Sequence, residues 1–174
     1  MKRKIQIGVM GSAADTKYSE EVQRIAEKVG ELIAKSGNIT VYGAEKDYDS
    51  LSTSAAKGAK RLNGITVGVT YGKGKEIWDK NTDIIISTGI ERGGGREFVL
   101  VNSCDIVIAI SGGSGTLTEL AIAYQSNIPM IVIKGTGGWS DKLADKYLDS
   151  RKRLKVIGVD SAEEAVKLAL ELGR

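Results

Sequence analysis

The segment 105–110, DIVIAI, is apolar at every position after its first residue. A strand with one solvated face alternates apolar and polar residues, so a continuous apolar run indicates a strand that is buried on both faces. Such strands occur in parallel sheets whose two faces are covered by crossover helices. Segments 65–70 and 129–134 are also rich in β-branched and apolar residues. This pattern predicts an α/β fold with a mostly parallel sheet.

Amphipathic segments separate these runs, as at 19–35, where apolar residues recur three and four positions apart. Gly37 follows this segment and is a typical helix stop, and Asp160 or Ser161 is placed to cap the last helix. With 174 residues and no linker or repeat, the chain is predicted to be one doubly wound domain over 1–174, with about seven strands and helices on both faces. The predicted strands are 4–10, 38–42, 65–70, 83–87, 105–110, 129–134 and 155–159, and the predicted helices are 19–35, 51–62, 97–103, 116–126 and 162–172.

Composition excludes several functional classes. A net charge of +3, dispersed along the chain, argues against nucleic-acid binding. No apolar run approaches the roughly 20 residues that span a bilayer, so no membrane association is expected. Cys104 is the only cysteine and is expected to be a small core residue, which favours a reducing, cytoplasmic location. Histidine is absent, which removes Ser-His-Asp catalysis and His-containing zinc sites, and no metal site is predicted.

The loop after 105–110 reads SGGSGT at 111–116 and opens directly into a predicted helix. Closely spaced glycines let a ligand approach the backbone, and the helix N-terminus offers unpaired N–H groups and the positive end of a dipole. These features favour a phosphate, although a plain connecting turn is the alternative. The loop matches neither the P-loop nor the dinucleotide fingerprint. The predicted phosphate-binding residues are Gly112, Gly113, Ser114, Gly115 and Thr116, joined by Gly11 and Ser12 from the loop after the first strand.

Two charged residues flank this turn in the sequence. Glu119 lies three residues after Thr116, a spacing that fits a capping box, and its alternative role is a carboxylate beside the phosphate site. Arg96 precedes the 105–110 strand and lies four residues after Arg92, so either side chain can reach a phosphate. Trp139 is a candidate lid or surface anchor.

The segment GGSGTLTE at 112–119 resembles the P-G-G-x-G-T-x-x-E motif of the Lonely-Guy/lysine-decarboxylase-like (SLOG) superfamily. Arg96 stands nine residues before Asp105, which is the spacing of the arginine in that superfamily. Segments 11–12 and 57–59 match its G-S-S turn and K-G-A helix pattern. The resemblance covers nearly the whole chain. It is nearest to an uncharacterised prokaryotic branch related to molybdenum cofactor carrier proteins, which shares the GTGGW loop at 135–139.

This resemblance implies a Rossmann-like fold, a homodimer or homotetramer, and a nucleotide-like small molecule as the partner. In hydrolase members, the matching arginine and glutamate cleave the N-glycosidic bond of a nucleoside monophosphate. Carried over, Arg96 would orient the ligand, and Glu119 would stabilise an oxocarbenium-like ribose or activate water as catalytic residues.

Two departures from the hydrolase pattern keep the function open. Ser111 stands where the hydrolases have proline, and 43–50, GAEKDYDS, replaces a glycine-rich loop and includes Asp47 and Asp49. Three hypotheses follow: a binding protein for a nucleotide or phosphate-bearing cofactor, a nucleoside 5'-monophosphate phosphoribohydrolase using Arg96 and Glu119, and a pterin or molybdenum cofactor carrier. The sequence does not identify the cofactor or base.

Overall fold

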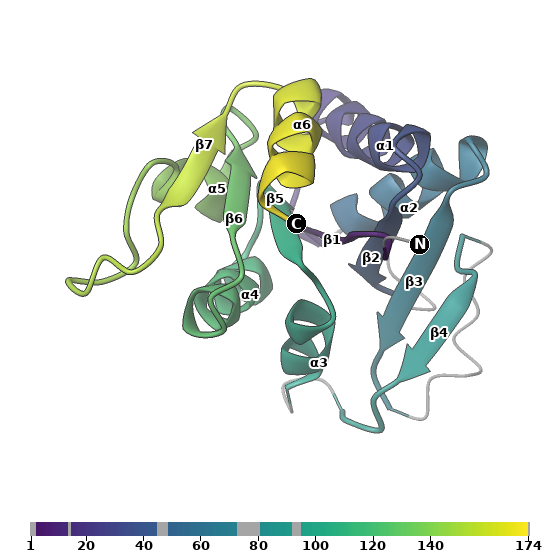
Figure 1. The fold of residues 1–174 in the computed structure, drawn as a ribbon, viewed down its shortest axis with the longest axis horizontal. Coiled ribbons are helices and arrows are strands. Elements are labelled where there is room, and N and C mark those ends of the chain that lie inside the picture. The colour runs from purple at the N-terminus through teal and green to yellow at the C-terminus, as the bar shows by residue number, and fades with distance from the viewer. Residues whose placement is uncertain (1–2, 14, 45–48, 73–80, 92–94, 174) are drawn as a thin grey trace.

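The structure is a computed structural model that describes residues 3–13, 15–44, 49–72, 81–91 and 95–173. The described residues form one seven-stranded parallel sheet in the order β4-β3-β2-β1-β5-β6-β7 (Figure 1). The strands are β1 (Gln6–Gly11), β2 (Ile39–Gly43), β3 (Ile65–Thr70), β4 (Ile84–Ser87), β5 (Ile106–Ile110), β6 (Met130–Ile133) and β7 (Val156–Val159). The helices are α1 (Glu20–Lys35), α2 (Leu51–Arg61), α3 (Arg96–Asn102), α4 (Ser114–Gln125), α5 (Gly138–Leu143) and α6 (Ala162–Leu172).

The predicted Rossmann-like α/β fold is confirmed, and the seven predicted strands match β1 to β7 within two residues at each end. Two helices differ from prediction. The short α5 was not predicted, and α4 begins at Ser114, two residues before its predicted start. Ser19 and Ser161 cap α1 and α6 by accepting hydrogen bonds from backbone amides of the first turn. Among the described residues, no helix combines the length and apolar character needed to cross a membrane.

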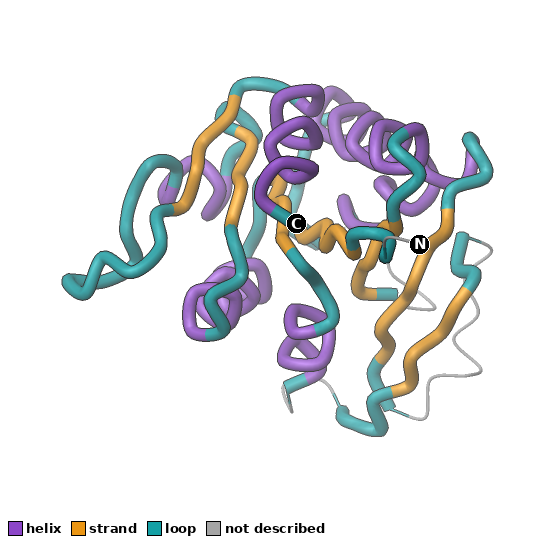
Figure 2. Tube along the Cα trace, viewed as in Figure 1, coloured by secondary structure: helices purple, strands orange, loops and turns teal. Residues whose placement is uncertain are grey.

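Helices cover both faces of the sheet, with α1, α2 and α6 on one side and α3, α4 and α5 on the other (Figures 1 and 2). Successive side chains of a strand point to opposite faces. Ile106, Ile108 and Ile110 therefore lie in the core with α1 and α6, whereas Val107 and Ala109 lie in the core with α3 and α4. All five residues are fully buried, which explains the continuous apolar run of β5.

Helices α1 and α2 pack with their backbones in close contact. A Cβ placed on Gly30 would lie 1.8 Å from the carbonyl oxygen of Ala55, and one on Gly58 would lie 1.9 Å from that of Glu27. Neither glycine has a left-handed φ, so the requirement is space rather than backbone conformation. This approach places the N-terminus of α2 against the loop after β1, where the Leu51 amide donates to the Ser12 carbonyl at 2.9 Å.

The order of the strands reverses at β1. The chain moves from β1 through β2 and β3 to β4 on one side, and then returns to place β5 on the other side of β1. Gly11, the last residue of β1, pairs with Ile110, the last residue of β5. The loops that follow these two strands therefore leave the sheet side by side, which is the usual ligand-binding position in open α/β sheets.

Gly30→Ala is expected to destabilise the protein by about 3 kcal/mol, because the new methyl group would overlap a backbone carbonyl that cannot rotate away. The measurement is denaturant unfolding followed by circular dichroism. Gly115→Ala is the matched control, since a Cβ there meets no atom within 4 Å. Equal unfolding midpoints for the two variants would contradict this account of the α1–α2 contact.

Candidate functional site

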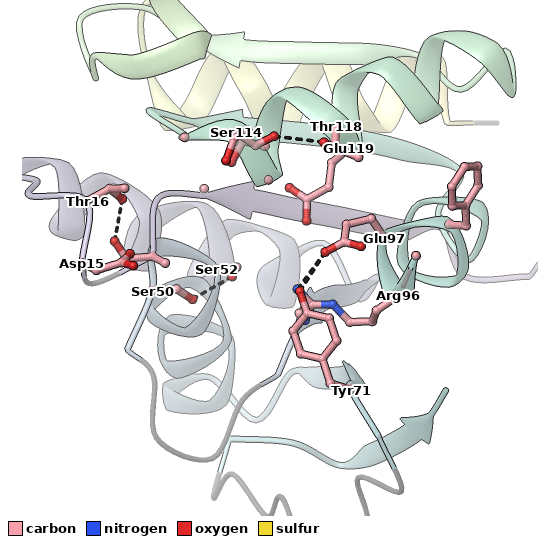
Figure 3. A pocket seen from close by; sticks show the side chains of 18 residues that line it. Asp15, Thr16, Ser50, Ser52, Tyr71, Arg96, Glu97, Ser114, Thr118 and Glu119 are labelled. Carbon is pink, nitrogen blue, oxygen red and sulfur yellow. Dashed lines mark hydrogen bonds and ion pairs between the residues drawn. The ribbon is translucent and has the colours of Figure 1, made fainter. Parts of the chain in front are cut away.

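A cavity of about 540 Å³ opens at the carboxyl ends of the central strands (Figure 3). Its volume lies in the range of pockets for small molecules and cofactors. Most of the predicted site residues line it. They come from the end of β1, the N-termini of α3 and α4, and the second turn of α4: Gly11, Arg96, Gly113, Ser114, Gly115, Thr116 and Glu119. The predicted residues Ser12 and Gly112 lie next to the cavity and are not part of its lining.

Ser12 lies behind the glycine-rich turn. It is buried, its Oγ accepts a hydrogen bond from the Gly112 amide at 2.9 Å, and it donates to the Ser111 Oγ at 3.1 Å. The side chain therefore joins the loop after β1 to the loop after β5. This geometry suits a residue that positions the turn.

The GTGGW loop supports the same turn from the other side. The Ser111 amide donates to the Thr136 Oγ1 at 2.8 Å, the Trp139 amide donates to the Gly112 carbonyl at 3.0 Å, and the Ser140 amide donates to the Ser111 carbonyl at 2.9 Å. The Trp139 side chain is not among the lining residues, so in this structure the tryptophan does not cover the cavity. Together, these three hydrogen bonds hold the backbone of the turn in one conformation.

Backbone geometry explains one departure from the hydrolase motif. Ser111 has a φ of +56° and Gly112 a φ of +106°. A proline ring holds φ at about −65°, so proline cannot occupy position 111 in this conformation. The turn therefore has a backbone conformation that serine can adopt and proline cannot.

Helix α4 begins at the turn without a side-chain cap. Gly113 is its N-cap residue, and among the described residues no side-chain cap hydrogen bond is formed at this helix end. Thr116 is the third residue of the helix, so it cannot be an N-cap, and the predicted capping box with Glu119 is wrong. The sequence pattern placed the N-cap three residues too late, because the glycines themselves form the start of the helix. The first N–H groups of α4 at Ser114 and Gly115 lie at the cavity wall.

The glycines of the turn differ in what they are needed for. Gly112 is required by the chain, because its φ is left-handed and a Cβ would lie 2.5 Å from the side chain of Thr116. A Cβ on Gly113 would make an ordinary contact of 3.5 Å with Thr16, and one on Gly115 would meet no atom within 4 Å. Internal packing therefore does not account for Gly113 and Gly115, which both line the cavity.

Glu119 lies in the second turn of α4 with its carboxyl group facing the cavity (Figure 3). The residue is only 8% exposed, and its side chain makes no hydrogen bond or ion pair with the described residues. Burial raises the pKa of the Glu119 carboxyl to about 8, against the lowering effect of Arg96 and with a further increase from Glu97. Because the carboxyl group faces the cavity, it is a candidate for ligand contact.

Arg96 is the first residue of α3, and its side chain crosses the end of the sheet. Its guanidinium Nη1 donates to the Val69 carbonyl at 3.3 Å, and the guanidinium carbon lies 4.1 Å from the centre of the Tyr71 ring. Gly43 is necessary here, because a Cβ would lie 2.4 Å from Nη1. Arg96 is therefore held between the end of β2 and an aromatic ring. Arg92, the alternative arginine, lies outside the described residues.

Glu97 and Tyr71 are lining residues that the sequence prediction missed. The Tyr71 hydroxyl donates to the Glu97 Oε1 at 2.8 Å, and this oxygen lies 3.9 Å from the Arg96 Nη2. Glu97 directly follows the predicted arginine, and Tyr71 directly follows β3. Both residues lie at the carboxyl end of the sheet, and this position was the signal from which they could have been predicted.

Helix α2 also begins at the cavity. Ser50 is its N-cap and accepts a hydrogen bond from the Thr53 amide at 3.0 Å, so this helix end carries its own side-chain partner. Asp49 pairs with Lys57 at 2.9 Å on the exposed side, whereas Asp47 lies outside the described residues. Cys104 is buried in the core, as predicted.

Comparisons with known proteins agree with this fold. The model of the SLOG cluster4 family matches residues 4–166. A protein of Archaeoglobus fulgidus, described as uncharacterised, is 36% identical over 137 residues, which are 75% of this chain and 85% of that protein. The structure of a molybdenum cofactor binding protein from Rippkaea orientalis superposes with a TM-score of 0.81 at 28% identity and 98% coverage of both chains. A molybdenum cofactor carrier protein from Chlamydomonas reinhardtii has a TM-score of 0.81 at 29% identity and 98% coverage of both chains.

In the ligand-free state, Glu119→Gln is expected to become increasingly more stable than the wild type as the pH rises from about 4.5 to about 8. Over this range the unfolded wild type releases the Glu119 proton while the folded wild type keeps it, so wild-type stability falls with pH. Glutamine has no proton to release, and its advantage grows to several kcal/mol near the upper end. The measurement is the free energy of unfolding against pH, with the exposed Glu171→Gln as control. Parallel pH profiles for the wild type and Glu119→Gln would contradict the raised pKa.

Proposed function

The chain belongs to the SLOG cluster4 family, and on that premise we propose that it binds a nucleotide or a phosphate-bearing cofactor with the phosphate at the turn 111–116. The observation that carries the proposal is the uncapped N-terminus of α4 at the wall of the cavity. Backbone N–H groups and the positive end of the helix dipole attract an anion at this position. The hydroxyl groups of Ser114 and Thr116 add possible donors.

The glycine pattern supports the same proposal. Gly113 and Gly115 are not required by internal contacts, and leaving out both side chains keeps the backbone amides open to a ligand. A turn that only connected β5 to α4 would need Gly112 alone. The extra glycines are therefore explained by a group that approaches the backbone closely.

A carrier function is favoured by the solved relatives. The proteins from Rippkaea orientalis and Chlamydomonas reinhardtii are named for binding and carrying the molybdenum cofactor, and they match this chain over nearly its whole length. The cavity volume of about 540 Å³ lies in the general range of small-molecule and cofactor pockets. Under this proposal, the chain holds such a cofactor at 111–116 and delivers it unchanged.

Hydrolysis of a nucleoside 5'-monophosphate is the second candidate, because Arg96 and Glu119 line the same cavity. With a pKa of about 8, Glu119 is protonated at neutral pH and can act as a general acid that donates its proton to the departing base. Stabilising an oxocarbenium-like ribose or activating water needs the ionised carboxylate, which the Arg96 guanidinium favours. The predicted homodimer or homotetramer stays a prediction for either candidate.

Gly115→Ala is expected to fold normally and to bind nucleoside monophosphates at least about tenfold more weakly, because the new methyl group would stand where the phosphate approaches. The measurement is the thermal shift of the protein over a series of ligand concentrations. Gln125→Ala, an exposed change at the other end of α4, is the matched control and should keep the wild-type shift. An unchanged shift in Gly115→Ala would place the phosphate elsewhere.

Chromatography of the stabilising mixtures separates the hydrolase from the binding protein. If the chain is a phosphoribohydrolase, free base and ribose 5-phosphate accumulate with the wild type and not with Glu119→Ala. If it is a binding or carrier protein, the nucleotide stabilises the wild type and is recovered intact. The absence of stabilisation by any phosphate-bearing compound would count against the proposed function as a whole.

A further inference from the structure

The two ends of the cavity differ in the groups that they offer to a ligand. Figure 3 shows Ser114 toward one end and the group of Arg96, Glu97 and Tyr71 toward the other, with the Glu119 carboxyl between them. The first end has the N–H groups of α4, which suit an anion. The second end has the Glu97 carboxyl beside the Arg96 guanidinium, so it offers hydrogen-bond acceptors as well as donors.

Glu97 is held in a defined orientation. Its Oε1 accepts the Tyr71 hydroxyl at 2.8 Å, and the same tyrosine ring stacks on the guanidinium of Arg96 at 4.1 Å. The Glu97 side chain is only 13% exposed, so its carboxylate meets little bulk water. An ionised carboxylate has about four lone-pair positions, and the Tyr71 hydroxyl uses one of them. The remaining positions can accept hydrogen bonds from a ligand in the cavity.

Glu119 adds a second carboxyl group between the two ends. Its carboxyl group is buried, faces the cavity and has no hydrogen-bond partner among the described residues. It lies five residues after Ser114, or about 7.5 Å along the helix axis. A ligand anchored by its phosphate at the start of α4 must therefore extend along the helix to reach the acceptors.

We propose that Glu97, oriented by Tyr71, is a specificity residue that selects ligands with two adjacent N–H donors at the end remote from the phosphate. The ring N–H and the amino group of a 2-amino-4-oxopyrimidine form such a pair, and guanine and pterin share this ring. A carboxylate accepts the two donors side by side, as it does from the fork of an arginine. An analogue with oxygen at position 2 places a second acceptor against the carboxylate and is disfavoured.

This assignment rests on the proposed function and is tested by paired ligands. The first pair is guanosine and inosine 5'-monophosphate, which differ only in the 2-amino group. The second pair is a phosphorylated hydroxymethylpterin and the corresponding lumazine, which has oxygen in place of the amino group. Dissociation constants are measured by calorimetry for the wild type, Glu97→Gln, Tyr71→Phe and the surface control Glu171→Gln.

The expected result is a preference of about tenfold or more for the amino member of at least one pair in the wild type and in Glu171→Gln. Glu97→Gln should bring both members of that pair to similar affinity, because an amide has only one acceptor oxygen. Tyr71→Phe should reduce the preference for the amino member more than it reduces the affinity for the disfavoured member. The pair that shows the preference identifies the ligand as a purine nucleotide or a pterin.

Two results would overturn the assignment and leave the proposed function intact. One is binding of both members of each pair with equal affinity. The other is a preference that survives in Glu97→Gln when circular dichroism shows that the variant is folded. Failure of all four compounds to bind would also overturn the assignment, and the proposed function would then be decided by the wider series of phosphate-bearing compounds.

Discussion

The pairing of β1 with β5 is the constraint on which the site depends. It joins two strands that are far apart in the sequence, and it aligns Gly11 with Ile110 at their last residues. Because both strands end at the same level, the loop with Ser12 and the turn at 111–116 meet directly above the sheet. The Ser12 hydroxyl then joins the two loops through the Gly112 amide. Without this register, the glycine-rich turn would have no support on the β1 side and the cavity would lose one wall.

Helix packing and electrostatics act together around this junction. The close contact of α1 and α2 at Gly30 and Gly58 brings the start of α2 to the edge of the cavity. On the other face, α3 presents Arg96, which Gly43 and Tyr71 hold in place. The resulting cavity has an anion-attracting helix end and an opposite end that offers hydrogen-bond acceptors as well as donors. Such asymmetry favours a ligand that is itself asymmetric, with a phosphate at one end and donors at the other.

Much of the fold was predictable because each strand and helix has a local pattern. The apolar run of β5 and the periodic spacing in α1 identified their elements correctly, and the carboxyl-end rule placed the glycine-rich turn and Gly11 at the cavity. The short helix α5 was missed because its six residues, which begin at a glycine, carry too short a pattern. The capping box at Thr116 was wrong because a spacing of three residues cannot reveal where the helix begins. Tyr71 and Glu97 were missed because their contact links residues 26 positions apart.

The sequence by itself determined the class of fold and the presence of a glycine-rich helix entry, since buried strands and close backbone approach leave patterns within a few neighbouring residues. Only the tertiary structure decided how the candidate site residues are placed. Burial of Glu119 without a partner, the left-handed φ of Ser111 and the place of Ser12 behind the turn all depend on groups that come from distant segments. The free energy of a side chain depends on its surroundings in space, and these surroundings exist only once β1 and β5 lie side by side.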